Sequence, residues 1–203
     1  MEAGPLLSFA LASLLIELTP GPNMTWLALV AAGEGRRRGY AAVAGVALGL
    51  AVLGLAAAFG VAELLQRSMI AYEILRWAGG LFLLYLAWDG WRGNGDVAQT
   101  GNGSNSIYFL RGLVTNMLNP KAALFYVAVL PTFLDPARPL LGQTLALSVV
   151  YVSVATVVHA GIVTAAGALT AFTQKPGREI ATRRVLSSLL ALVAVWLIWS
   201  TAR

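Results

Sequence analysis

Pro20-Gly21-Pro22-Asn23 and Asn119-Pro120-Lys121 interrupt two long apolar segments of this chain, one in each half of the sequence. A proline lacks the backbone N–H and clashes with the carbonyl four residues earlier, so each motif predicts a break in a helix that hydropathy places inside a bilayer. Backbone groups freed at that depth must line something polar, and paired broken helices indicate a central binding site in a membrane protein built from two repeats. The motifs therefore predict a transporter, with Pro20 and Pro120 at equivalent depths in its two halves.

The composition is that of an integral membrane protein. Of the 203 residues, 58% are hydrophobic and only 11% are charged, whereas the apolar fraction of soluble domains is about 45–50%. A spanning helix needs about 20 apolar residues, and the stretches that suit one run roughly over residues 6–32, 39–62, 74–91, 113–134, 140–172 and 185–202. We expect an all-α transmembrane domain of six helices over residues 1–203, in contact with the lipid bilayer and with no nucleic-acid partner.

A stretch rich in Gly, Asn and Ser at residues 93–106 divides three expected spans from three. Such a composition is typical of a flexible linker. Because each half would cross the membrane an odd number of times, a duplication would give two inverted repeats, residues 5–92 and 107–202. Transmembrane helices 1 and 4 are then the first helices of the two repeats, and both are broken at their proline motifs.

Positive charges are concentrated on one side of this arrangement. The richer side holds Arg36, Arg37, Arg38, Arg92, Arg111, Lys175, Arg178, Arg183 and Arg184. By the positive-inside rule that side is cytoplasmic, which predicts a multi-pass protein of the cytoplasmic (inner) membrane with both termini outside.

Small residues recur at four-residue spacing at Ala41, Gly45 and Gly49, and such spacing lets two helices approach closely. Packing within one bundle is the favoured interpretation, and a homodimer contact is the alternative. The chain contains no cysteine and one histidine, so neither a metal site nor a cofactor is predicted.

Two charged side chains, Glu17 and Lys121, lie beside the predicted breaks. An ionised side chain that faced lipid at this depth would be penalised by about 2.5–3.5 kcal/mol even on the lenient insertion scale, so both are expected to face the interior as a pair or in a shared cavity. Alternatively, Lys121 extends toward an interface and Glu17 caps the half-helix that restarts after Pro22.

His159 is the only histidine, and it lies in the middle of the fifth expected span. It joins Glu17 and Lys121 as a candidate for ion coupling, because imidazole titrates near neutral pH; a hydrogen-bonded histidine packed in the bundle is the alternative. A hydrolase built on Ser153 and His159 is not expected, since residues six apart on one helix do not face each other. We therefore predict that the chain is not an enzyme.

The broken helices also suggest a class of ligand. Half-helix N-termini favour anions such as a carboxylate and half-helix C-termini favour cations, so a zwitterion suits both, although inorganic ions would fit the same dipoles. The predicted substrate-binding residues are Thr19, Pro20, Gly21, Pro22, Asn23, Asn116, Asn119 and Pro120.

Several ordered motifs resemble those of the LysE/RhtB family of amino-acid exporters. They are Leu18-Thr19-Pro20-Gly21-Pro22-Asn23, the run from Trp77 to Trp88, and Asn119-Pro120-Lys121-Ala122-Ala123-Leu124-Phe125. The resemblance implies a six-helix inner-membrane protein that exports amino acids in exchange for protons. Many members carry Asp where this chain has Asn23, which leaves Glu17 as the expected acidic coupling residue.

The expected function is therefore secondary active export of amino acids or related small metabolites, by proton antiport with alternating access of the two halves. In this interpretation Glu17 carries the proton and Lys121 tunes its affinity. The alternative is a transporter of a cation or another small solute with the same fold.

Overall fold

The computed structural model describes residues 3–18, 21–60, 68–92, 104–169 and 179–200. The regular structure of these residues is helical, which confirms the all-α prediction for them. Two helices, α3 (Arg36–Ala58) and α8 (Leu140–Ala166), are long and apolar enough to cross a membrane unbroken, and two bent helix pairs raise the number of candidate spans to as many as four. The fold is thus that of a multi-pass membrane protein, with two to four candidate spans by length and composition.

The first bent pair consists of α1 (Ala3–Leu18) and α2 (Pro22–Glu34), whose axes differ by 60°. Gly21 precedes α2 in an extended conformation, with φ −158° and ψ 172°, and Pro22 is the first residue of the helix. Proline suits that position because the N–H it lacks would have no partner within the helix. Thr19 and Pro20 lie outside the described residues.

The second bent pair has the same construction. α6 (Asn105–Met117) is followed by α7 (Pro120–Leu124), which continues into the π-helical turn η1 (Phe125–Val129) and the 3-10 turn η2 (Leu130–Phe133). The axes on either side of the break differ by 50°. Asn119 caps α7, since its Oδ1 accepts a hydrogen bond of 3.0 Å from the backbone N–H of Lys121.

Among the described residues, Pro22 has the same position as Pro120, whereas Pro20, which the sequence paired with Pro120, lies outside them. Pro22 and Pro120 are each the first residue of a half-helix, preceded by a single capping residue in an extended conformation. Because the second residues of the two half-helices are Asn23 and Lys121, these two side chains occupy equivalent positions at the two breaks.

The start of the fourth apolar segment differs from the prediction. We expected a linker through residue 106 and a span from residue 113, whereas α6 begins at Asn105. The side chain of Ser104 accepts a hydrogen bond from the backbone N–H of Ser106, and a serine in this position favours helix initiation. The helix begins with the polar residues Asn105 and Ser106, and Arg111 lies in its second turn, so hydropathy placed the start of the span later. The rest of the predicted linker, residues 93–103, lies outside the described residues.

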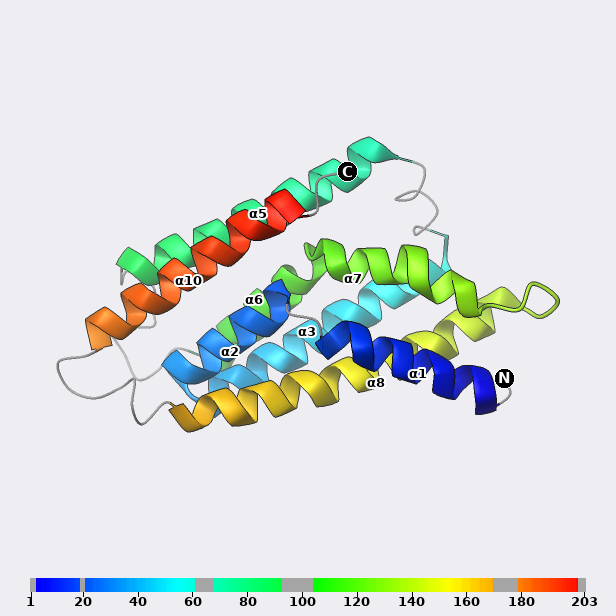
Figure 1. Ribbon diagram of the computed structural model, residues 1–203, viewed down its shortest axis with the longest axis horizontal. Helices are drawn as coiled ribbons and strands as arrows, with labels where there is room; N and C mark the ends of the chain where they lie inside the picture. The colour runs from blue at the N-terminus through cyan, green and yellow to red at the C-terminus, as the bar shows by residue number, and fades with distance from the viewer. Residues whose placement is uncertain (1–2, 19–20, 61–67, 93–103, 170–178, 201–203) are drawn as a thin grey trace.

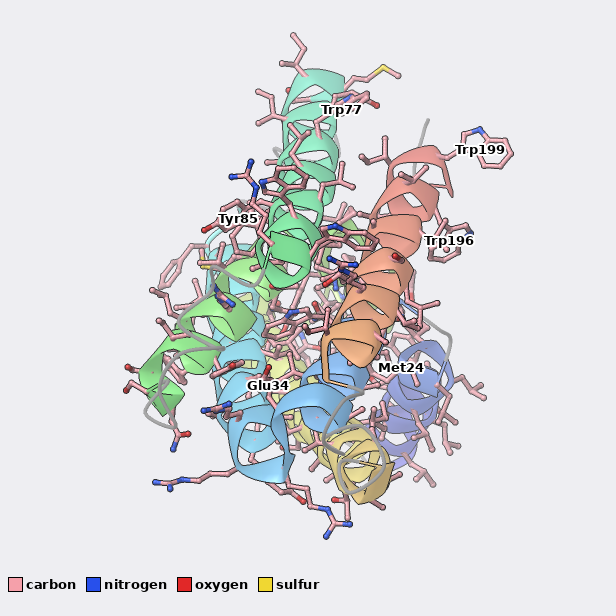
Figure 2. All side chains as sticks on the ribbon, turned by 90° about the vertical axis from the view of Figure 1, so that its left-hand side faces the viewer. Met24, Glu34, Trp77, Tyr85, Trp196 and Trp199 are labelled. Carbon is pink, nitrogen blue, oxygen red and sulfur yellow. The ribbon has the colours of Figure 1, made fainter. Side chains whose placement is uncertain are left out.

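Two further helices, α5 (Met69–Arg92) and α10 (Glu179–Ser200), lie side by side along one edge of the molecule (Figure 1). Their apolar cores are shorter, at Trp77–Trp88 and Arg184–Trp196. Trp77, Trp196 and Trp199 point away from the bundle (Figure 2) and are about half exposed or more. This placement fits an aromatic belt at a membrane surface.

The chain runs back and forth along the bundle (Figure 1). α2, α5 and α8 end near the place where α3, α6 and α10 begin, and the first residues of α1 and the last residues of α10 lie away from this end. Arg36, Arg37 and Arg38 start α3, so they lie at the end of the bundle away from the start of α1.

The broken helix of each half packs on the long helix of the other half, α6 on α3 and α1 on α8. The contact between α3 and α6 joins backbone to backbone: a Cβ added to Gly45 would lie 1.9 Å from the carbonyl oxygen of Phe109, and one added to Gly112 would lie 2.3 Å from that of Ala42. The small residues of α3 therefore pack inside the bundle, as the favoured interpretation predicted.

A second close approach brings α5 to the break between α6 and α7. A Cβ on Gly79 would lie 2.1 Å from the carbonyl oxygen of Leu118, which follows the last residue of α6. The neighbouring Gly80 faces the side chain of Ile198 on α10 instead. Two adjacent glycines thus let α5 pack closely against both the break between α6 and α7 and the helix α10.

Candidate functional site

A small cavity lies where the two breaks meet. The residues around it come from both halves of the chain: Glu17, Gly21, Asn23, Met24, Leu50, Asn116, Asn119, Lys121, Ala122, Tyr151 and His159. Its volume is about 10 Å³, which is close to the minimum that holds a single water. The site is therefore narrow, and it must expand to admit an organic solute.

Glu17 lies in the last turn of α1 and is 6% exposed. Its Oε1 accepts a hydrogen bond of 2.7 Å from the hydroxyl of Tyr151, and its Oε2 lies 3.2 Å from Nε2 of His159. Tyr151 and His159 are eight residues apart on α8, about two turns, so they share one face of that helix. Both carboxylate oxygens of Glu17, on α1, are therefore contacted by side chains of α8.

Lys121 lies on the other side of the cavity, as the second residue of α7. An electrostatic interaction links it to Glu17. Its side chain also covers the capping residue of the other break, because a Cβ on Gly21 would lie 3.2 Å from Cδ and 3.4 Å from Nζ of Lys121. A cation from the second break thus lies beside the N-terminus of α2 at the first.

A direct hydrogen bond also joins the two bent pairs. Nδ2 of Asn23, on α2, donates to Oδ1 of Asn116, on α6, at 2.7 Å. Among the described residues, Oδ1 of Asn23, Nδ2 of Asn116 and Nδ1 of His159 are buried without a hydrogen-bond partner. Buried polar atoms are nearly always paired, so these atoms offer one acceptor, one donor and one imidazole nitrogen to a bound solute.

The structure brings together most of the residues that the sequence singled out. Those that line the cavity are Glu17, Gly21, Asn23, Asn116, Asn119, Lys121 and His159. Pro22 and Pro120 are buried at the first positions of α2 and α7, where they set the half-helices without lining the cavity. For Thr19 and Pro20, which lie outside the described residues, the predicted role is not tested.

Sequence reasoning missed four lining residues: Met24, Leu50, Ala122 and Tyr151. Tyr151 carried one usable signal, since its spacing of eight residues from His159 places the two on one helix face. Met24, Leu50 and Ala122 are apolar residues in apolar helices, and nothing in their spacing distinguishes them from neighbours that face lipid.

The Asn23–Asn116 bond gives a first testable prediction. Replacing either residue with alanine leaves the other amide buried and unpaired, at a cost of about 1–3 kcal/mol. We expect Asn23→Ala and Asn116→Ala each to lower the thermal stability of the purified protein, and the double variant to lose less than the sum of both. Additive losses would show that the two amides do not interact.

Two broken helices that meet at a small cavity with buried polar side chains, inside a bundle of apolar helices, are the architecture of a solute transporter of the membrane. The family model described as "LysE type translocator" matches residues 14–201, and the chain belongs to this family.

Named relatives agree with the family assignment. The chain is 33% identical over 195 residues, 94% of each sequence, to proteins named homoserine/homoserine lactone efflux protein from Salmonella typhi and Salmonella typhimurium. It is 35% identical over 132 residues, 63% of each sequence, to a leucine efflux protein from Enterobacter sp.. No solved structure matches the chain significantly.

Proposed function

We propose that this chain is a secondary active exporter of amino acids or related small metabolites, which exchanges its substrate for protons across the cytoplasmic membrane. The observation that carries the proposal is a buried carboxylate, Glu17, in a small cavity between two half-helices. An ionisable group at this depth is a functional candidate by default. The efflux names of the relatives support an amino acid as the substrate.

The cavity offers complementary groups for the two ends of an amino acid. Glu17 binds the ammonium group, while Lys121 and the N-terminus of α2 bind the carboxylate. A proton competes with the ammonium group for Glu17, so a proton that arrives from outside displaces the substrate. His159 contacts the same carboxylate at 3.2 Å and passes the proton onward. Competition between the proton and the ammonium group for the carboxylate of Glu17 couples inward movement of protons to outward movement of substrate.

The arrangement in the membrane is part of the proposal. Six spans form two inverted three-helix repeats, residues 5–92 and 107–202, with α5 and α10 as the third helices of the two repeats and both termini outside. The matching breaks at Pro22 and Pro120 support the repeat, and the arginines that begin α3 support the orientation. Alternating access then opens the cavity to one side at a time. A homodimer is a further proposal, to be tested from the mass of the purified protein.

Inside-out vesicles containing the protein test the function. Their lumen corresponds to the outside of the cell, so proton antiport predicts that an acidic lumen drives labelled amino acid inward. Leucine, threonine, lysine and a divalent metal are compared, each with and without the proton gradient. Accumulation of an amino acid only with the gradient supports the proposal, and accumulation of the metal alone would favour the cation alternative.

Lys121 gives a second testable prediction. In substrate counterflow, which needs no proton gradient, we expect Lys121→Gln to raise the apparent KM about tenfold or more, because a hydrogen bond to a charged group is worth about 1.5–3 kcal/mol. The maximum rate should change less. Arg138→Gln is the control, since Arg138 is a half-exposed cation that pairs with Asp135 and lies outside the cavity. An unchanged KM in Lys121→Gln would contradict this role.

A further inference from the structure

We infer that Tyr151 is a positioning residue, which fixes the carboxylate of Glu17 at the cavity and ties it to the second broken helix through Phe125. The inference rests on the proposed function, because it assigns Tyr151 to the same proton site. Neither the sequence motifs nor the family assignment singles out this residue.

Tyr151 touches both broken helices from the long helix α8. Its hydroxyl donates a hydrogen bond of 2.7 Å to Oε1 of Glu17, at the end of α1. Its ring stacks on the ring of Phe125, with centroids 3.7 Å apart and planes inclined by 19°. Phe125 opens the π-helical turn that follows α7, and such turns occur frequently at functional sites. One side chain therefore joins the carboxylate of the first half to the broken helix of the second.

The ring of Tyr151 is held on more than one side. Besides the stack on Phe125, it meets the ring of Tyr126 edge to face at 5.4 Å, and it is 1% exposed. Phe125 is itself supported by Phe9 of α1, with centroids 5.5 Å apart. A ring packed in this way cannot follow a moving carboxylate. Tyr151 therefore sets where Glu17 lies rather than adapting to it.

The protonation state of Glu17 determines how strong a hydrogen bond the hydroxyl of Tyr151 forms with it. An ionised carboxylate only accepts hydrogen bonds, so it suits the hydroxyl of Tyr151 and an N–H of His159. Lys121 on α7 also interacts with it electrostatically, whereas Tyr126 on η1 is a nearby titratable group whose hydroxyl donates its hydrogen bond to Leu50 instead. When Glu17 gains a proton, the charge-assisted bond from Tyr151 is lost. The stack on Phe125 then carries this change to the second break.

Tyr126 provides a matched control within the same aromatic cluster. It is 2% exposed, and its hydroxyl donates a hydrogen bond of 2.8 Å to the backbone oxygen of Leu50 rather than to a carboxylate. Tyr126→Phe and Tyr151→Phe each remove one buried hydroxyl and keep the ring. Only the second of these variants removes a donor from Glu17.

Infrared spectroscopy of the purified protein reads the protonation of Glu17 without any substrate. The carbonyl band of the protonated carboxyl group is assigned by its loss in Glu17→Gln. In Tyr151→Phe we expect this band to reach half its height at a pH about one to two units higher than in the unaltered protein, because the ionised form has lost a charge-assisted hydrogen bond. The pH profile of counterflow should move in the same direction, and Tyr126→Phe should leave both unchanged.

Equal shifts in both tyrosine variants, or no shift in Tyr151→Phe, would overturn the inference. Phe125→Leu is a second variant, which removes the stack and keeps the hydroxyl of Tyr151. It should give a smaller shift of the band in the same direction, and no shift in this variant would contradict the coupling to the second broken helix. The two proposals fail separately. A band that shifts as expected in a protein that accumulates no amino acid refutes only the transport function, and normal export with an unshifted band refutes only the role of Tyr151.

Discussion

Export against a gradient should disappear when Glu17 is replaced by glutamine. Glutamine has nearly the shape of a protonated glutamate and cannot release a proton, so the exchange loses its driving ion. A membrane potential supplies about 2.3 kcal/mol per charge per 100 mV, enough for a concentration ratio of about 50 per proton. In inside-out vesicles we expect that ratio to fall to about one in Glu17→Gln, while counterflow of substrate at equal concentrations continues with a raised apparent KM, because Glu17 also binds the ammonium group.

Glu34→Gln is the matched control for that experiment. Glu34 ends α2, about 18 Å along the helix from Pro22, and forms an ion pair with Arg38 away from the cavity. Because this pair lies at the far end of α2 and contacts neither Glu17 nor the cavity, the variant should still export uphill. If Glu17→Gln sustained the same gradient as the unaltered protein, Glu17 would not be the coupling residue.

A single methyl group at position 45 should destabilise the whole bundle. The Cβ of Gly45→Ala would lie 1.9 Å from the carbonyl oxygen of Phe109 and 2.8 Å from the backbone nitrogen of Leu113. Neither atom can rotate away, because both belong to the backbone of α6, so the two helices must separate. Overpacking typically costs about 1–3 kcal/mol, and a backbone contact that cannot yield should fall at or above the upper end. The measurement is thermal unfolding of the purified protein in detergent.

Gly161→Ala serves as the control for Gly45→Ala and should act in the opposite direction. Gly161 lies in the interior of α8, and no heavy atom lies within 4 Å of the Cβ that an alanine would add. Without a clash, the change from glycine to alanine favours a helix by up to about 1 kcal/mol. Equal destabilisation by both substitutions would show that the contact between α3 and α6 does not limit stability.

Most of the candidate site could be predicted from local sequence. Glu17 and Lys121 were identified because charged residues are rare in apolar helices, and Asn23, Asn116 and Asn119 because they flank the breaks. Tyr151 was not identified, since its one sequence signal, the spacing of eight residues from His159, does not by itself separate a lipid-facing ring from one that binds a carboxylate. Its role depends on Glu17, 134 positions away in the sequence.

The helix boundaries also divide into those that local sequence predicts and those that it does not. The breaks near Pro22 and Pro120 followed from the backbone chemistry of proline, which acts within one turn. The early start of α6 at Asn105 did not follow from hydropathy, because that helix begins with polar residues and a serine cap. Hydropathy identifies the apolar segment that can lie in the hydrocarbon core of a bilayer, whereas the helix can begin before that segment does.

The sequence by itself determined that the chain is an apolar helical protein broken once in each half, because hydropathy and proline geometry act over a few residues. Only the tertiary structure decided that Glu17 meets Tyr151 and His159, that Asn23 bonds to Asn116, and that Gly45 rests on the backbone of Phe109. These contacts depend on how each helix is rotated about its axis. In helices that are apolar on every side, the sequence period does not specify that rotation, and the packing of small against large side chains sets it.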